Sequence, residues 1–201
     1  MVNVKSLMLG INGFSYGYFM RCKIPAITSL FNTSGRGVVY NNNFNIENAW
    51  SVIMEYNNGF NMPENINKSN TVLINIPVKN PTYGIYSSDY KNIDYNTEIS
   101  EVFKLIDKNI GKSPVIASIN VLNRNFSMDE KCNIYSLIDS NIYNIINKLD
   151  EFIIFSPYGD YKSENLYEPY GVYISSRARP NPHKTVNISE IIKIFSEIIY
   201  L

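Results

Sequence analysis

The chain of 201 residues is poor in the side chains that bind metals through nitrogen or sulfur. It contains one histidine, His183, and two cysteines, Cys22 and Cys132. A metal centre built from several imidazoles is therefore excluded by composition. The cysteines form no CxxC pair or Cys/His cluster, and neither has a histidine nearby in sequence, so thiol catalysis is not expected. Two reduced, buried thiols are the expected state, with one long-range disulfide as the alternative.

The sequence also lacks long apolar runs and a charge of one sign. No stretch reaches the length of a membrane span, and the apolar run near Met1 is too short for a signal peptide. We therefore expect a cytoplasmic protein with no membrane partner. Lys and Arg together number 18, as do Asp and Glu, so no net field attracts the chain to nucleic acid. Nucleic acid is thus not an expected partner.

What remains is typical of one globular domain. Hydrophobic residues make up 45% of the chain and charged residues 18%, a composition far from that of disordered proteins. The length is sufficient for a core without disulfides or structural metals. We expect a single domain over residues 1–201.

Apolar runs and helical periodicity alternate along the chain. Continuous apolar runs predict strands over 5–11, 38–40, 71–76, 114–119, 152–155 and 171–174. Helices are predicted over 25–31, 47–56, 96–110, 127–149 and 188–200. Gly35 and Gly37 are interpreted as the end of the first helix, a capping box at Ser127 and Glu130 as the start of the longest, and 57–70 as a loop. This alternation predicts an α/β fold, a three-layer sandwich with a mostly parallel central sheet.

Several short motifs together resemble the alkaline phosphatase superfamily, in particular archaeal type I phosphodiesterases and nucleotide pyrophosphatases. Leu7–Phe14 is similar to the family's first strand leading into Asp-Gly, and Ala49-Trp50-Ser51 to the Ala-Trp-Thr/Ser of its nucleophile helix. The other similar segments, in family order, are Pro25–Leu30, Gly35–Gly37, Ile74–Pro81 with Gly84, Phe152–Gly159 and Gly171–Ile174. The resemblance covers nearly the whole chain and implies an alkaline-phosphatase-like fold.

The resemblance also implies a hydrolase with two divalent metals and a Thr or Ser nucleophile. When the family pattern is carried over, its metal ligands and nucleophile fall on residues of other chemistry. The first metal-binding Asp falls on Asn12 and the nucleophile on Ile46. The remaining ligand positions fall on Asn120, Arg124, Pro157, Tyr158 and Tyr167. We therefore expect no metal, no cofactor and no catalytic residue at these former-site positions. Asp139 matches a family Asp without a metal role, and we expect it to make a structural hydrogen bond.

The leading hypothesis is a non-catalytic member, a pseudoenzyme that binds a protein or an anionic small molecule through the former cleft. The alternative is a metal-dependent phosphodiesterase or other phosphoester hydrolase with a carboxylate-only site, for which Asp89, Asp94 and Asp160 are candidates. A third possibility is a homo-oligomer whose main role is assembly.

Each remaining candidate residue has a functional and a structural interpretation. Asn12-Gly13 is either a polar ligand contact or a left-handed turn, the latter being favoured. Arg124 is either an anion-binding residue or a surface arginine. Tyrosines 158, 161, 167, 170 and 173 either form a recognition surface or fill the cleft. A basic loop, which is either an anion-binding segment or solvated, contains Arg177, Arg179, His183 and Lys184.

Overall fold

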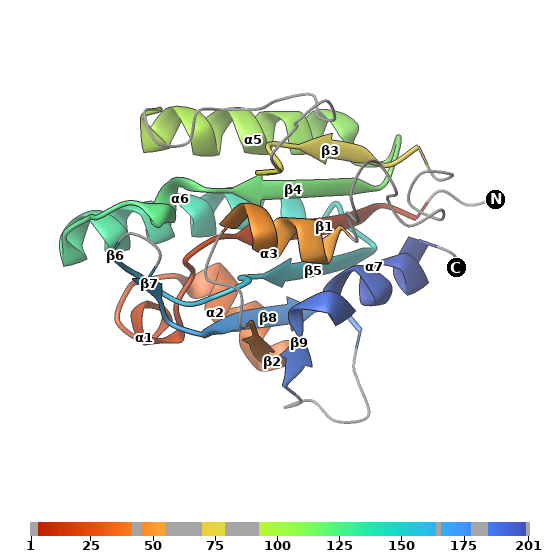
Figure 1. Ribbon diagram of the computed structural model, residues 1–201. Coiled ribbons are helices and arrows are strands. Elements are labelled where there is room, and N and C mark those ends of the chain that lie inside the picture. Colours follow the sequence, from red (N-terminus) through yellow and green to blue (C-terminus); the bar gives the residue numbers. More distant parts are fainter. Residues whose placement is uncertain are drawn as a thin grey trace.

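A central sheet organises the protein. The computed structural model describes residues 4–41, 46–54, 70–78, 93–163, 166–177 and 185–199, and almost all of the loop predicted over 57–70 lies outside these ranges. Seven strands form the main sheet in the order β3-β4-β1-β5-β8-β2-β9 (Figure 1). Their bounds are β1 Ser6–Ile11, β2 Gly35–Tyr40, β3 Val72–Ile74, β4 Val115–Ile119, β5 Glu151–Phe155, β8 Tyr170–Ser175 and β9 Val186–Asn187.

The sheet is mostly parallel, as predicted. Strands β3, β4, β1 and β5 pair in parallel, and β9 pairs in parallel with β2. Strand β8 is antiparallel to both β5 and β2. Every residue of β1 and β4 is buried, which explains why these central strands are continuous apolar or small-residue runs.

Helices cover both faces of the sheet and produce the predicted three-layer α/β arrangement (Figure 1). Helices α2 (Pro25–Thr33), α5 (Tyr95–Asn109) and α6 (Met128–Ile146) contribute to one core, and α3 (Ile46–Ile53) and α7 (Ile191–Ile199) to the other. Successive residues of β1 point to opposite faces: Leu7 and Leu9 enter the first core and Met8 the second. In the described part of the chain, no helix is both long and apolar enough to cross a membrane.

The elements that the sequence did not predict are short. They are α1 (Tyr16–Phe19), the 3-10 turn η1 (Val121–Asn123), strand β9, and the hairpin of β6 (Tyr161–Ser163) with β7 (Leu166–Tyr167). The helix predicted over 188–200 begins with a 3-10 turn, η2 (Ile188–Glu190). The interpretation of Gly35 and Gly37 as a helix end was wrong, because both lie in β2. A side chain at Gly35 would meet the Arg177 carbonyl oxygen, at 2.4 Å from the Cβ atom, so glycine here permits a close backbone approach.

The capping box at the start of α6 is confirmed. The Ser127 hydroxyl accepts a hydrogen bond from the Glu130 backbone N–H at 3.3 Å, and the Glu130 carboxylate accepts one from the Ser127 N–H at 2.8 Å. The Ser127 side chain lowers the pKa of Glu130, because its hydrogen bond stabilises the ionised carboxyl. Local sequence therefore determines where this helix begins.

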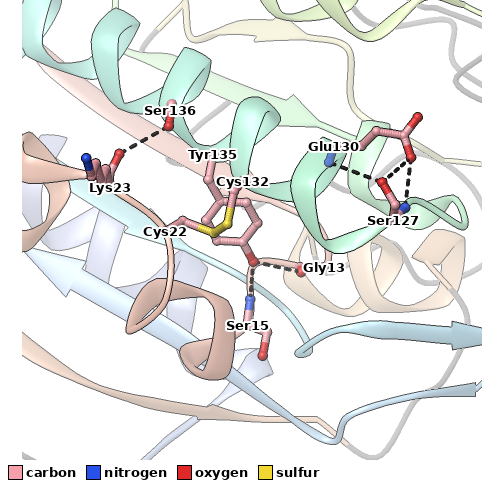
Figure 2. Close-up of a disulfide and its surroundings, with 9 residues drawn as sticks. All are labelled: Gly13, Ser15, Cys22, Lys23, Ser127, Glu130, Cys132, Tyr135 and Ser136. Atoms are coloured by element: carbon pink, nitrogen blue, oxygen red, sulfur yellow. Dashed lines mark hydrogen bonds between the residues drawn. A yellow bond between two sulfur atoms is a disulfide. The ribbon is translucent and has the colours of Figure 1, made fainter.

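The expectation of two reduced, buried thiols was wrong. Cys22 and Cys132 form a disulfide with their Cα atoms 5.0 Å apart, and both residues are half-buried. The 110 residues between them conceal the proximity in the sequence. The pair meets because the connection between α1 and α2 folds back against the first turns of α6 (Figure 2).

Candidate functional site

Asn12 follows the last residue of β1 and lies at the centre of a buried polar network. Its amide nitrogen donates to the Ser118 hydroxyl at 2.9 Å and to the side-chain oxygen of Asn120. Its side-chain oxygen accepts a hydrogen bond from the Trp50 indole N–H at 2.9 Å. The structural interpretation of Asn12-Gly13 agrees with this geometry, since Gly13 has a φ of 83° and Asn12 is fully buried.

Asn120 extends this network to the end of β3. Its amide nitrogen donates to the backbone carbonyl of Asn75 at 3.0 Å, and its backbone N–H donates to Glu98 at 2.6 Å. The Asn75 amide donates to the same Glu98 oxygen at 3.0 Å. The carboxyl ends of three parallel strands are thus connected by amide side chains and one carboxyl group.

Glu98, which was not among the residues predicted from the sequence, is fully buried in the first turn of α5. Its position four residues before Val102, on the apolar stripe of the helix, was the available signal. Desolvation by burial raises the pKa of Glu98 to about 7, although hydrogen bonds from Asn120 and Asn75 and the charge of Arg124 oppose this rise. The second carboxyl oxygen of Glu98 has no hydrogen-bond partner among the described residues.

The Trp50 ring occupies the space beside β1. It is fully buried, and its Cζ2 atom would lie 2.4 Å from a Cβ atom at Gly10. Its ring centroid is 5.7 Å from that of Phe155 at the end of β5. Ile46, which falls at the nucleophile position, is the first residue of α3, and its side chain lies outside the described part.

The residues after β5 fill the remaining space with aromatic rings. Pro157 lies in the bend after the strand, and the buried Tyr158 donates its hydroxyl to the Asn123 side chain at 2.9 Å. The Tyr158 and Tyr167 ring centroids are 4.2 Å apart. Tyr173 is also buried, Tyr161 is half-buried and Tyr170 is exposed. Four of the five tyrosines therefore fit the cleft-filling interpretation better than a recognition surface.

The described carboxylate candidates are already engaged. The Asp160 carboxylate contacts Lys131 Nζ at 2.5 Å and Lys162 Nζ at 3.3 Å. Asp94 caps α5 by accepting from the Thr97 N–H at 3.0 Å, and this hydrogen bond lowers the pKa of the exposed Asp94 carboxyl. Asp89 lies outside the described residues.

The described arginines contact the protein itself. Arg124 donates to the Ile93 carbonyl at 2.7 Å, and its guanidinium carbon lies 5.2 Å from the Phe126 ring centroid. Arg177 pairs with Glu151 at 3.3 Å. Both residues are half-buried and not simply solvated, and the Nη2 atom of each has no hydrogen-bond partner among the described residues. Arg179, His183 and Lys184 lie outside the described residues, so their predicted anion binding stays a prediction.

Asp139 makes the structural hydrogen bonds that were expected. Its carboxylate accepts from the backbone N–H groups of Ile27 at 2.7 Å and Ala26 at 3.3 Å, in the first turn of α2. These bonds satisfy donors that a helix leaves unpaired at its start. Asp139 therefore joins α6 to α2.

The site residues do not fit a pair of divalent metal ions. Within the described ranges, no three His, Cys, Asp or Glu side chains gather closely enough to hold a metal. Asn12 and Asn120 lie together, but their side chains are hydrogen-bonded to each other. The side-chain oxygen of Asn12 already accepts a hydrogen bond from the Trp50 indole N–H. The Tyr158 hydroxyl donates to Asn123, and Arg124 donates to the Ile93 carbonyl. Neither side chain is hydrogen-bonded to Asn12 or Asn120 among the contacts described. Neutral amide, indole and phenol groups cannot neutralise two dications.

The fold is similar to those of solved structures that include a member of the alkaline phosphatase superfamily. A protein from Pyrococcus horikoshii superposes with a TM-score of 0.62 at 8% identity, covering 99% of this chain and 97% of that one. Human ectonucleotide pyrophosphatase/phosphodiesterase 5 gives a TM-score of 0.61 at 9% identity over 98% of this chain and 95% of that one. A Vibrio parahaemolyticus protein in the alkaline phosphatase superfamily gives 0.61 at 10% identity, over 99% and 67%. The sequence matches no protein-family model and no curated protein.

Proposed function

We propose that this chain is a non-catalytic protein with an alkaline-phosphatase-like framework, a degenerate relative of the phosphodiesterase branch that acts by binding a partner. One observation carries the proposal. The carboxyl ends of the parallel strands, where such folds place their ligands, hold the Asn12–Asn120–Trp50 network in place of charged metal ligands. Asp94 and Asp160 are the described carboxylates proposed above as alternative metal ligands. Asp94 caps a helix, and Asp160 pairs with two lysines.

The partner class that the described residues support best is a protein. Arg124 and Arg177 already bind a backbone carbonyl and a carboxylate, and the remaining Nη2 atom of each, unpaired among the described residues, is buried rather than exposed to a ligand. Large apolar side chains are exposed on α1 and the residue after it, on β7, and at the ends of β2 and β8. They are Tyr16, Met20, Tyr40, Leu166 and Tyr170. Tyrosine and methionine are enriched where proteins contact each other.

The assembly state and the compartment belong to the same proposal. A second copy of the chain is one partner that these side chains could contact, and light scattering over a range of concentrations measures it. The cytoplasmic location expected from the sequence stays a prediction. The Cys22–Cys132 disulfide favours an oxidising compartment instead, because cytosolic reductants keep most thiols reduced.

Metal content per chain tests the absence of catalysis. The purified protein is incubated with zinc and manganese, desalted and measured by mass spectrometry, and bis-p-nitrophenyl phosphate hydrolysis is assayed in parallel. We expect neither stoichiometric metal nor hydrolysis above the rate without protein. Two ions per chain with metal-dependent hydrolysis would overturn the proposal and place the ligands among residues outside the described ranges.

A further inference from the structure

The disulfide secures a short segment that covers the strand ends. Cys22 lies between α1 and α2, and its backbone N–H donates to the Tyr18 carbonyl at the end of α1 at 2.9 Å. Its sulfur is bonded to Cys132 in the second turn of α6 (Figure 2). A helix of four residues has no stability of its own, so these external contacts hold α1 in place.

A buried ion pair lies beneath α1. Lys131 precedes Cys132 in α6, and its Nζ atom contacts the Asp160 carboxylate at 2.5 Å, with both side chains at most 5% exposed. The ring centroid of Tyr18 lies 4.7 Å from the same Nζ atom. Tyr18, which belongs to α1, therefore packs against this ammonium.

Hydrogen bonds hold the other end of α1. The Ser15 hydroxyl donates to Glu168 at 2.8 Å. The Ser15 N–H donates to the Tyr135 hydroxyl at 2.8 Å (Figure 2). Lys162 contacts both Glu168, at 3.0 Å, and Asp160, at 3.3 Å. The cluster beneath and beside α1 thus contains two lysines and two carboxylates, which balance in charge.

We propose that the Cys22–Cys132 disulfide is a redox-sensitive latch that holds α1 closed over the Lys131–Asp160 pair. Both half-buried cysteines are accessible enough for attack by a small thiolate. A dithiol reductant transfers two electrons and two protons to the disulfide, giving two cysteine thiols and the cyclic disulfide of the reductant. Only noncovalent contacts then hold α1, among them the Ser15 hydrogen bonds and the buried Phe19, and their release lets water reach the ion pair.

The opening of α1 should be local, because the disulfide joins only the segment after α1 to the second turn of α6. Burial of the Lys131–Asp160 pair carries a desolvation cost, because both ions lose hydration. This cost favours the open position of α1 once the disulfide is broken. The opened face adds Lys131 and Asp160 to a surface on which Lys162 and Glu168 are already partly exposed. Reduction would thereby expose a second lysine–carboxylate pair beside the strand ends.

The acetylation rate of Lys131 tests the latch. The intact protein is treated with a water-soluble amine-acetylating reagent, with and without prior dithiol treatment, and peptides are quantified by mass spectrometry. We expect Lys131 to react about tenfold faster or more after reduction, whereas Lys104, 71% exposed on α5, reacts equally in both states. The Cys22→Ser/Cys132→Ser variant should show the fast Lys131 rate with or without dithiol.

Three outcomes would overturn the proposal. Lys131 could remain equally protected after confirmed reduction, or protein purified and oxidised in air could contain two free thiols. Alternatively, reduction could shift the emission of Trp50, the single tryptophan, which belongs to the core on the opposite face. That shift would identify the disulfide as a crosslink that stabilises the whole fold. None of these results depends on the metal content, so this test is separate from that of the proposed function.

Discussion

The indole N–H of Trp50 donates to the side-chain oxygen of Asn12 across 2.9 Å, and this contact joins α3 to the end of β1. A neutral hydrogen bond connects these two elements at the edge of the sheet where parallel α/β folds bind their ligands. The contact needs the amide at position 12 and the glycine at position 10, because Gly10 leaves room for the ring. The neutral chemistry of the site therefore rests on a few residues that can be tested singly.

Asn12→Asp should destabilise the protein by at least about 2 kcal/mol, because a buried carboxylate would face the Asn120 oxygen and lose the donors of the amide. Urea unfolding monitored by circular dichroism measures the loss. Asn133→Asp, the same change at an exposed position of α6, should alter the free energy of unfolding by less than about 0.5 kcal/mol. Recovery of Asn12→Asp stability on addition of Mn²⁺ would show that the residues around position 12 still suffice to hold a metal ion, contrary to the poor fit described above.

Gly10→Ala should displace Trp50, because the new methyl group would lie 2.4 Å from the ring. We expect overpacking to cost about 1–3 kcal/mol and the fluorescence emission of the single tryptophan to shift to longer wavelength. Gly17→Ala is the matched control, since the nearest atom to its Cβ, the Ser15 oxygen, is at 3.6 Å. An unchanged spectrum in Gly10→Ala would show that the ring does not pack as described.

Glu98 should make stability fall as pH rises from about 4.5 to about 7. Its pKa rises from 4.5 to about 7 on folding, so the folded protein retains a proton that the unfolded chain releases in this window. The contribution is present below about pH 4.5 and lost above about pH 7, with a size on the order of 3 kcal/mol. Urea unfolding at several pH values measures this dependence.

Glu98→Gln, which removes the titration, should flatten this part of the profile. Glu101→Gln, at a more exposed position of the same helix, should leave the slope unchanged. Parallel profiles for the wild type and Glu98→Gln would mean that Glu98 titrates alike in the folded and unfolded states.

The Lys131–Asp160 pair should respond to truncation far more than a surface pair of equal length. Lys131→Met leaves Asp160 buried with only Lys162 at 3.3 Å, and we expect a loss of about 3–5 kcal/mol. Lys148→Met breaks the Lys148–Asp107 contact, also 2.5 Å long but half-exposed on both sides, and should cost less than about 1 kcal/mol. Equal losses in urea unfolding would contradict the burial of Lys131.

Local patterns explain which parts of the fold could be predicted. The apolar runs of β1 and β4 and the stripe of Ile134, Ile138 and Ile142 on α6 report burial on one strand or one helix face, so they are visible in sequence. The capping box at Ser127 is equally local, because its two side chains are three residues apart. β6 and β7 escaped prediction because each is too short to show a periodic pattern.

Composition by itself determined that a site with several histidines is impossible, since the chain has one, and the order of apolar segments determined a mostly parallel α/β sheet. Only the tertiary structure decided which polar residues meet. It paired Cys22 with Cys132, Lys131 with Asp160, and Glu98 with Asn75 and Asn120. These partners are 22 to 110 residues apart in sequence. No local pattern encodes such contacts, because they depend on how strands and helices stack across the sheet.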